Sequence, residues 1–191
     1  MRLFVGVELD DAVRAAAGAA AEKLRSAFKR RRINLDARWS PPENLHVTIW
    51  FVGEVPDDRA AAIRGVLDQP FSEPRFDLSV AGCGAFPPSG PPRVIWFGLS
   101  AGVDPLKRLY AEVASRFSPL GLEPERRAYS PHLTIARVKD VPRGAVRDVR
   151  TVLADASPAC GTCTIDAVTL FRSRTSPKGA TYEPLLRVPL S

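Results

Sequence analysis

The chain has 191 residues, of which 45% are apolar and 25% are charged, a composition that excludes an intrinsically disordered protein and suits one domain or two small lobes with a shared core. Its first ten residues hold no long apolar run, so we expect no signal peptide, no membrane association and a cytoplasmic location. The net charge is +6, and 22 of the 27 cationic residues are Arg. Because guanidinium groups make two-point contacts with phosphate, this balance permits a nucleic-acid partner, although genomic base composition explains it equally well.

The first half of the sequence predicts strands and helices in turn. Asp10 or Asp11 can cap the first helix, and Pro41 and Pro42 break the chain before the next strand. The expected elements are a buried strand over residues 2–9, an Ala-rich helix over 11–30, a strand over 45–52, a helix over 56–67 and a strand over 75–86.

The second half repeats this order. The expected elements are a strand over 93–99, a helix over 104–117, a strand over 132–138, a helix over 143–153 and strands near 163–171 and 182–190. Short strands in pairs with helices between them favour an α+β fold with two pseudo-symmetric lobes, one from each half, in which a mostly antiparallel sheet is backed by helices. We expect residues 1–191 to form a single bilobal domain, with the active site in the cleft between the lobes.

The two histidines of the chain lie in matching tetrapeptides, His46-Val47-Thr48-Ile49 and His132-Leu133-Thr134-Ile135. Because residues i and i+2 of a strand share a face, each histidine shares a face with its threonine, while the two apolar residues point into a core. A single such pair is ordinary for a half-exposed strand. Its recurrence in both halves, each time after a proline, indicates a function.

Two opposed imidazoles suit in-line attack at phosphorus. One takes a proton from the nucleophile and the other supplies a proton to the leaving oxygen, since the ordinary pKa of histidine is near 6.5. The hydroxyls of Thr48 and Thr134 can donate hydrogen bonds to phosphoryl oxygens. This chemistry requires no metal and no cofactor, and the residues alone do not decide which histidine is the acid.

Three cysteines, Cys83, Cys160 and Cys163, are expected to be reduced. The spacing of Cys160 and Cys163 is that of redox motifs and zinc ligands. In a regular strand, however, the two side chains would point to opposite faces, and a zinc site needs about four ligands.

The two histidine motifs and the sequence blocks around them resemble the 2H phosphoesterase superfamily. Within it they resemble the RNA 2′,3′-cyclic phosphodiesterases, once described as 2′-5′ RNA ligases. The resemblance covers nearly the whole chain. The blocks that carry it are Arg2 to Val7, Trp39 to Thr48, Phe51 to Val55, Ser130 to Arg137, Leu170 to Ser173 and Gly179 to Tyr182. It implies hydrolysis of an RNA 2′,3′-cyclic phosphate to a 2′-phosphate, with RNA ends or cyclic nucleotides as partners and a monomeric enzyme.

The resemblance also implies roles for single residues. His132 would activate water as the base, and His46 would protonate the departing 3′ oxygen. Arg137 and Phe51 would contact the substrate, although each lies five positions after its histidine and strict alternation turns it to the opposite face unless the strand bulges or ends. Core packing is the alternative for Phe51.

Four further features lie close to these motifs. Phe4 and Tyr129 are weaker candidates for substrate contacts and have structural roles as the alternative. Trp50 is expected on the face of His46, where it would shape the pocket wall. The run from Lys29 to Arg32 ends a helix, where cations suit the helix dipole, and contact with RNA is the alternative.

Other functions remain open at this point. They are 2′-5′ ligation of RNA, trimming of RNA 3′ ends, RNA-end binding without catalysis, and metal binding through His and Cys. Binding alone does not require two opposed proton-transfer groups, and the few metal-ligating residues disfavour a metal protein.

Overall fold

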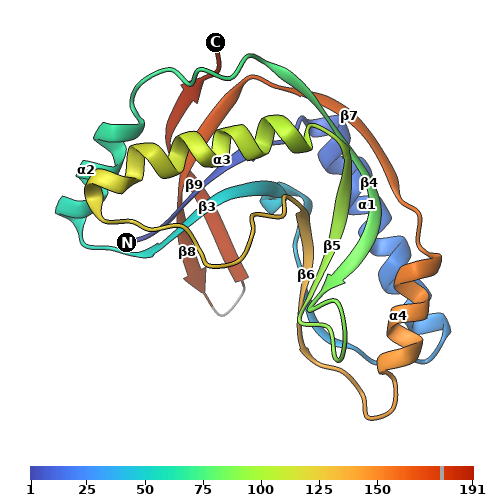
Figure 1. Cartoon of the computed structure of the whole chain (residues 1–191). Helices are drawn as coiled ribbons and strands as arrows, with labels where there is room; N and C mark the ends of the chain where they lie inside the picture. Colours follow the sequence, from blue (N-terminus) through green and yellow to red (C-terminus); the bar gives the residue numbers. More distant parts are fainter. Residues whose placement is uncertain (177–178) are drawn as a thin grey trace.

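In the computed structural model, whose described residues are 1–176 and 179–191, the strands form one curled sheet with the helices on its outer side (Figure 1). The described part of the chain gives a nine-stranded antiparallel sheet in the order β7-β4-β5-β6-β3-β1-β8-β9, with β2 paired to β6. The strands are β1 (Arg2–Glu8), β2 (Asp36–Trp39), β3 (His46–Glu54), β4 (Phe76–Phe86), β5 (Val94–Ala101), β6 (Leu133–Asp140), β7 (Ala159–Ile165), β8 (Ala167–Ser176) and β9 (Gly179–Pro189). The predicted α+β class is confirmed.

Four α-helices in the described residues cover one face of the sheet. They are α1 (Asp11–Arg30), α2 (Asp57–Leu67), α3 (Val103–Phe117) and α4 (Val146–Asp155), with short 3₁₀ turns η1 (Pro42–Asn44) and η2 (Ser118–Leu120). Asp10 caps α1, because its carboxylate accepts a hydrogen bond from the Val13 amide at 2.7 Å. No helix in the described ranges is long and apolar enough to span a bilayer.

Most elements lie where the sequence predicts them, with two clear exceptions. Strand β2 is not among the predicted elements. The strand expected near 163–171 is two strands, β7 and β8, which meet at Asp166 and lie at distant positions in the sheet. The hydrophobic run from Thr164 to Phe171 conceals this break, because both strands bury apolar residues on either side of it.

The two lobes meet where β3 pairs with β6. The only backbone partners in this ladder are Val47 and Leu133, so the two strands diverge on either side of that pair. The sheet order is symmetric about it: β6, β5, β4 and β7 form one lobe, and β3, β1, β8 and β9 form the other.

Each lobe contains segments from both halves of the sequence, so the expectation that each half forms one lobe is wrong. Helix α1 follows β1 of one lobe but packs against β7 and α4 of the other, and α3 follows β5 yet packs against β3 (Figure 1). Strand β4 likewise joins the lobe of β5 and β6. A single cluster of buried apolar side chains therefore extends through both lobes.

Candidate active site

Both histidines lie beside the junction of the two lobes, on the face of the sheet opposite the helices. We call this face the histidine face; it carries His46 and Thr48 of the first motif and His132 and Thr134 of the second. The alternate residues Val47, Ile49, Leu133 and Ile135 are buried in the core, as predicted. An antiparallel register extended from the Val47–Leu133 pair aligns each histidine with the threonine of the other motif.

Each motif strand contains a bulge at the third position after its histidine. Along β1, which is regular, Gly6 pairs with Thr48 and Phe4 pairs with Phe51, so Ile49 is the extra residue of β3. Residues that are directly opposite share a face, and Phe4 and Gly6 are two positions apart. Phe51 therefore returns to the face of Thr48, where 47% of its surface is exposed.

The second motif strand has the same irregularity. Along β5, Trp96 pairs with Thr134 and Val94 pairs with Arg137, which leaves Ile135 as the extra residue of β6. Arg137 consequently lies on the histidine face, and its charge lowers the pKa of both His46 and His132. Of the two alternatives for the fifth position after each histidine, a bulge is therefore the one found.

The bulge also corrects the prediction for Trp50. This side chain does not share the face of His46 but is buried in the core, stacked on Tyr110 with ring centroids 5.2 Å apart. Tyr110 stacks in turn on Tyr129 at 4.5 Å, and the Tyr129 hydroxyl donates to the Thr48 carbonyl at 2.9 Å. Tyr129 thus supports the first motif strand from the core.

The backbone fixes the same tautomer of both imidazoles. The Nδ1–H of His46 donates to the Asn44 carbonyl at 2.8 Å, and the Nδ1–H of His132 donates to the Ser130 carbonyl at 2.7 Å. Because a carbonyl only accepts, each neutral ring keeps its lone pair on Nε2. The Thr48 hydroxyl donates to Nε2 of His46 at 3.1 Å, whereas the described contacts include no such bond between Thr134 and His132.

Aromatic side chains enclose the imidazoles unequally. His46 stacks on Phe4 with centroids 4.6 Å apart and meets Tyr182 edge-on at 5.0 Å, while His132 meets Phe86 edge-on at 5.1 Å. Burial is the main reason that the pKa of His46 falls to about 4, with smaller contributions from the charges of Arg137 and His132. Burial also lowers the pKa of His132. Both rings are therefore neutral near pH 7.

Sequence reasoning missed several residues that position His46. Phe171 stacks on Phe4 at 4.9 Å, and the Asn44 side chain donates to the Ala180 carbonyl at 2.6 Å, which ties η1 to β9. Gly6 lies against the first motif, since a Cβ atom there would be 2.8 Å from the Val47 carbonyl oxygen and 3.5 Å from Cδ2 of His46. Two signals pointed to part of this set: Asn44 and Ser130 each lie two positions before a histidine, and Gly6, Asn44 and Phe171 lie within the blocks that carry the family resemblance.

The cysteines form no second site. Gly161 has a φ of 96° and lies in a bulge of β7, so Cys160 and Cys163 are both buried on the helix side and do not point to opposite faces. Burial raises the pKa of both thiols. Among the described residues, no group of three or more His, Cys, Asp or Glu side chains could hold a metal ion.

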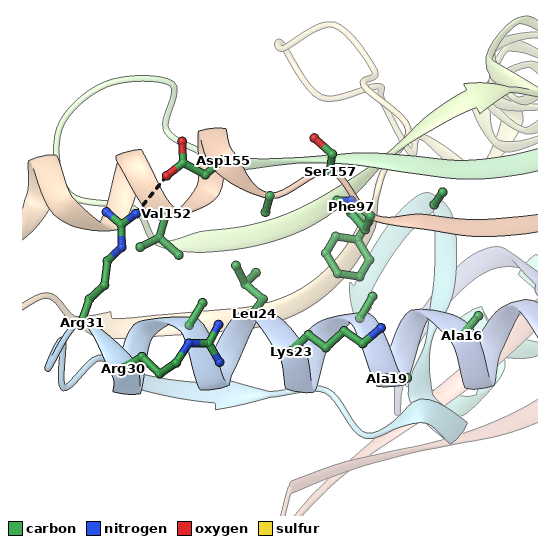
Figure 2. A pocket seen from close by; sticks show the side chains of 15 residues that line it. Ala16, Ala19, Lys23, Leu24, Arg30, Arg31, Phe97, Val152, Asp155 and Ser157 are labelled. Carbon is green, nitrogen blue, oxygen red and sulfur yellow. Dashed lines mark hydrogen bonds and ion pairs between the residues drawn. The ribbon is translucent and has the colours of Figure 1, made fainter.

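A groove of about 740 Å³ lies away from the histidines, between α1 and α4 (Figure 2). Its floor includes Leu24, Phe97 and Val152, and at its rim Arg31 forms an ion pair with Asp155 at 3.0 Å. The cationic run from Lys29 to Arg32 thus ends α1 as predicted, and none of its residues lies on a motif strand.

Comparison with known proteins shows which family the chain resembles. Residues 10–177 match the family model described as the 2′-5′ RNA ligase superfamily. The chain is 34% identical to an RNA 2′,3′-cyclic phosphodiesterase of Archaeoglobus fulgidus over 97% of this chain and 98% of the relative. It is 31% identical to the protein of the same name from Thermotoga maritima, over 97% and 93% of the two chains.

Solved structures share the fold. A protein of Thermus thermophilus superposes with a TM-score of 0.72 and 27% identity over 99% of this chain and 97% of that one. LigT of E. coli complexed with 3′-AMP superposes with a TM-score of 0.73 over 100% and 98% of the two chains, and at 22% identity it supports the fold alone.

Proposed function

The chain belongs to the 2′-5′ RNA ligase superfamily, and from this premise we propose that it hydrolyses RNA 2′,3′-cyclic phosphate ends to 2′-phosphates. Relatives that are 30–34% identical over most of the chain carry the name of this activity. The single observation that best supports the proposal is the pseudo-symmetric pair of motif strands, which presents two neutral imidazoles and one arginine charge that acts on both.

The proposed reaction is an in-line displacement at phosphorus. His132 Nε2 takes a proton from water as the water oxygen bonds to phosphorus, and His46 Nε2 gives a proton to the 3′ oxygen as its bond to phosphorus breaks. The phosphate remains on the 2′ oxygen. The order of the two roles follows the resemblance to the family, because the paired strands are nearly symmetric.

The proton on His46 is proposed to arrive with the substrate. The free enzyme holds this ring neutral because its pKa is about 4. An anionic phosphate beside Nε2 opposes the effects of burial and of Arg137, so it raises the pKa and favours the protonated ring. The acid is therefore formed mainly in the substrate complex.

Four further residues are proposed to hold the substrate. Thr48 and Thr134 would donate their hydroxyls to the non-bridging oxygens, with Thr48 turning from His46 Nε2 when phosphate binds. Arg137 would balance the negative charge that gathers at phosphorus. Phe51, half exposed on the same face, offers a ring on which a base can stack.

A metal-free mechanism completes the proposal. Two imidazoles and one guanidinium supply the proton transfers and the positive charge that this displacement needs. The described residues offer no cluster of metal-ligating side chains near them. The proposal therefore assigns no step to a metal ion.

The test is an end-group assay on an oligonucleotide with a 2′,3′-cyclic phosphate, in the presence of EDTA. We expect a 2′-phosphate product at an undiminished rate. We also expect His46→Ala and His132→Ala each to lower kcat by roughly 10² to 10⁴-fold, the usual contribution of one general acid or base.

Each other outcome has a definite meaning. Activity that disappears with EDTA and returns with zinc or manganese contradicts the metal-free mechanism. Binding of the cyclic end without turnover identifies an RNA-end binding protein. A substrate in which sulfur replaces the bridging 3′ oxygen shows which histidine is the acid and which is the base. It should restore turnover to His46→Ala and not to His132→Ala, since a thiolate leaves without a proton.

A further inference from the structure

Arg38 of β2 lies directly opposite Arg137 of β6 in an antiparallel ladder. Directly opposite residues have their side chains on one face of the sheet. The neighbouring Trp39 points to the other face, where it packs near Phe28 of α1 with ring centroids 6.4 Å apart. Arg38 therefore stands on the histidine face beside Arg137.

This arrangement opposes two like charges without a compensating carboxylate. Like charges directly across a ladder destabilise a sheet, whereas seven arginines among the described residues form ion pairs with acids. No ion pair or side-chain hydrogen bond involves Arg38 or Arg137 in the described residues. The carboxylates nearest along these strands, Asp36 and Asp140, are opposite each other at the end of the ladder.

Both guanidinium groups are exposed and free to bind an anion. Arg137 is close enough to lower the pKa of both histidines. Arg38 lies beside it on β2, which pairs with the same edge of β6 as β3 does, on the side opposite β5. Strands lie about 4.8 Å apart, so the two forks suit two phosphates of one nucleotide.

We propose that Arg38 binds the phosphate on the 5′ oxygen of the terminal nucleotide, while its cyclic phosphate lies between the histidines. This inference rests on the proposed function and extends it. The preferred substrate is then the end of an RNA chain or a 5′-phosphorylated nucleotide, and a nucleoside 2′,3′-cyclic phosphate without a 5′ phosphate lacks one contact.

The experiment compares adenosine 2′,3′-cyclic phosphate with its 5′-phosphorylated form. We expect the wild type to hydrolyse the 5′-phosphorylated form with a kcat/KM about 10-fold higher or more, the usual size of one charge-assisted contact. Arg38→Gln should remove this preference while leaving the rate on the simpler substrate unchanged. Arg38→Lys should keep part of the preference, because a point charge replaces the planar fork.

Arg64→Gln is the matched control. It removes one exposed arginine from α2, for which the described residues give no side-chain partner, and should leave the preference intact. Relief of the like-charge contact predicts an unfolding temperature for Arg38→Gln at or above that of the wild type, which separates the substrate effect from misfolding.

Three results would overturn the inference: a wild type without preference, equal losses on both substrates in Arg38→Gln, or the same loss of preference in Arg64→Gln. Calorimetric binding of adenosine 2′-phosphate and adenosine 2′,5′-bisphosphate gives a readout that needs no turnover. If the wild type hydrolyses neither cyclic substrate and also leaves the cyclic end of the oligonucleotide intact, the proposed function fails. The affinity ratio of these two ligands still decides the role of Arg38.

Discussion

At the scale of single residues, the environment of His46 determines its chemistry. Phe4 and Tyr182 enclose the ring, and Asn44 fixes its tautomer through the backbone. Burial makes the protonated ring unfavourable, so the pKa falls from 6.5 to about 4. The same side chain in the unfolded chain would titrate near its ordinary pKa.

This difference predicts an acid-dependent loss of stability. The unfolded chain binds more protons at this residue between pH 6.5 and about 4, so the contribution of His46 is complete above pH 6.5 and is lost as the pH falls toward 4. The loss is at most about 3 kcal/mol. We expect denaturant titrations at several pH values to show a shallower dependence for His46→Gln than for the wild type over this range. Parallel curves would show that His46 titrates normally in the folded protein.

At the scale of elements, the close contact of β1 with β3 positions His46. A side chain at Gly6 would enter the space of the Val47 carbonyl, so the two backbones must separate to admit even a methyl group. The bulge at Ile49 depends on this pairing of β1 with β3, and the bulge at Ile135 depends on the pairing of β5 with β6. The arrangement of the site therefore depends on how the strands pair, and the motif sequence alone does not determine it.

Gly6→Ala tests this dependence. We expect a folded protein that is destabilised by about 1–3 kcal/mol, with kcat reduced because the His46 ring is displaced. Gly65→Ala in α2 is the control, since a Cβ atom there meets nothing within 4 Å; alanine should be neutral or stabilise the helix by up to about 1 kcal/mol. Wild-type kcat in Gly6→Ala would show that the close contact does not position the ring.

At the scale of the whole molecule, the exchange of helices between lobes joins them energetically. Helix α1 packs against β7 and buries Leu24, and α3 packs against β3 and buries Leu109. Neither half of the sequence contains a complete lobe, so we propose that residues 1–191 fold as one unit.

This organisation predicts one unfolding transition. Circular dichroism and tryptophan fluorescence should give the same unfolding midpoint. Leu24→Ala and Leu109→Ala should each lower the free energy of unfolding by about 2–5 kcal/mol and shift both midpoints together. Two separated transitions, or a stable fragment that contains only the first half, would contradict the proposal.

The sequence by itself determined most of the elements and singled out the two histidines as a candidate pair. Hydrophobic alternation, proline breaks and helix propensity are local, so the two motif strands were accessible without coordinates, and the cap of the first helix was narrowed to Asp10 or Asp11. The resemblance added Arg137 and Phe51 as substrate contacts, which remain proposals.

Only the tertiary structure decided which residues share the histidine face. A bulge exists relative to a partner strand, and the partners of β3 and β6 lie far away in sequence, so alternation alone placed Trp50 beside His46 and turned Phe51 and Arg137 away. The position of Arg38 beside Arg137 and the exchange of helices between lobes likewise depend on long-range pairing. Such pairing depends on the free energy of the whole sheet, which no local pattern encodes.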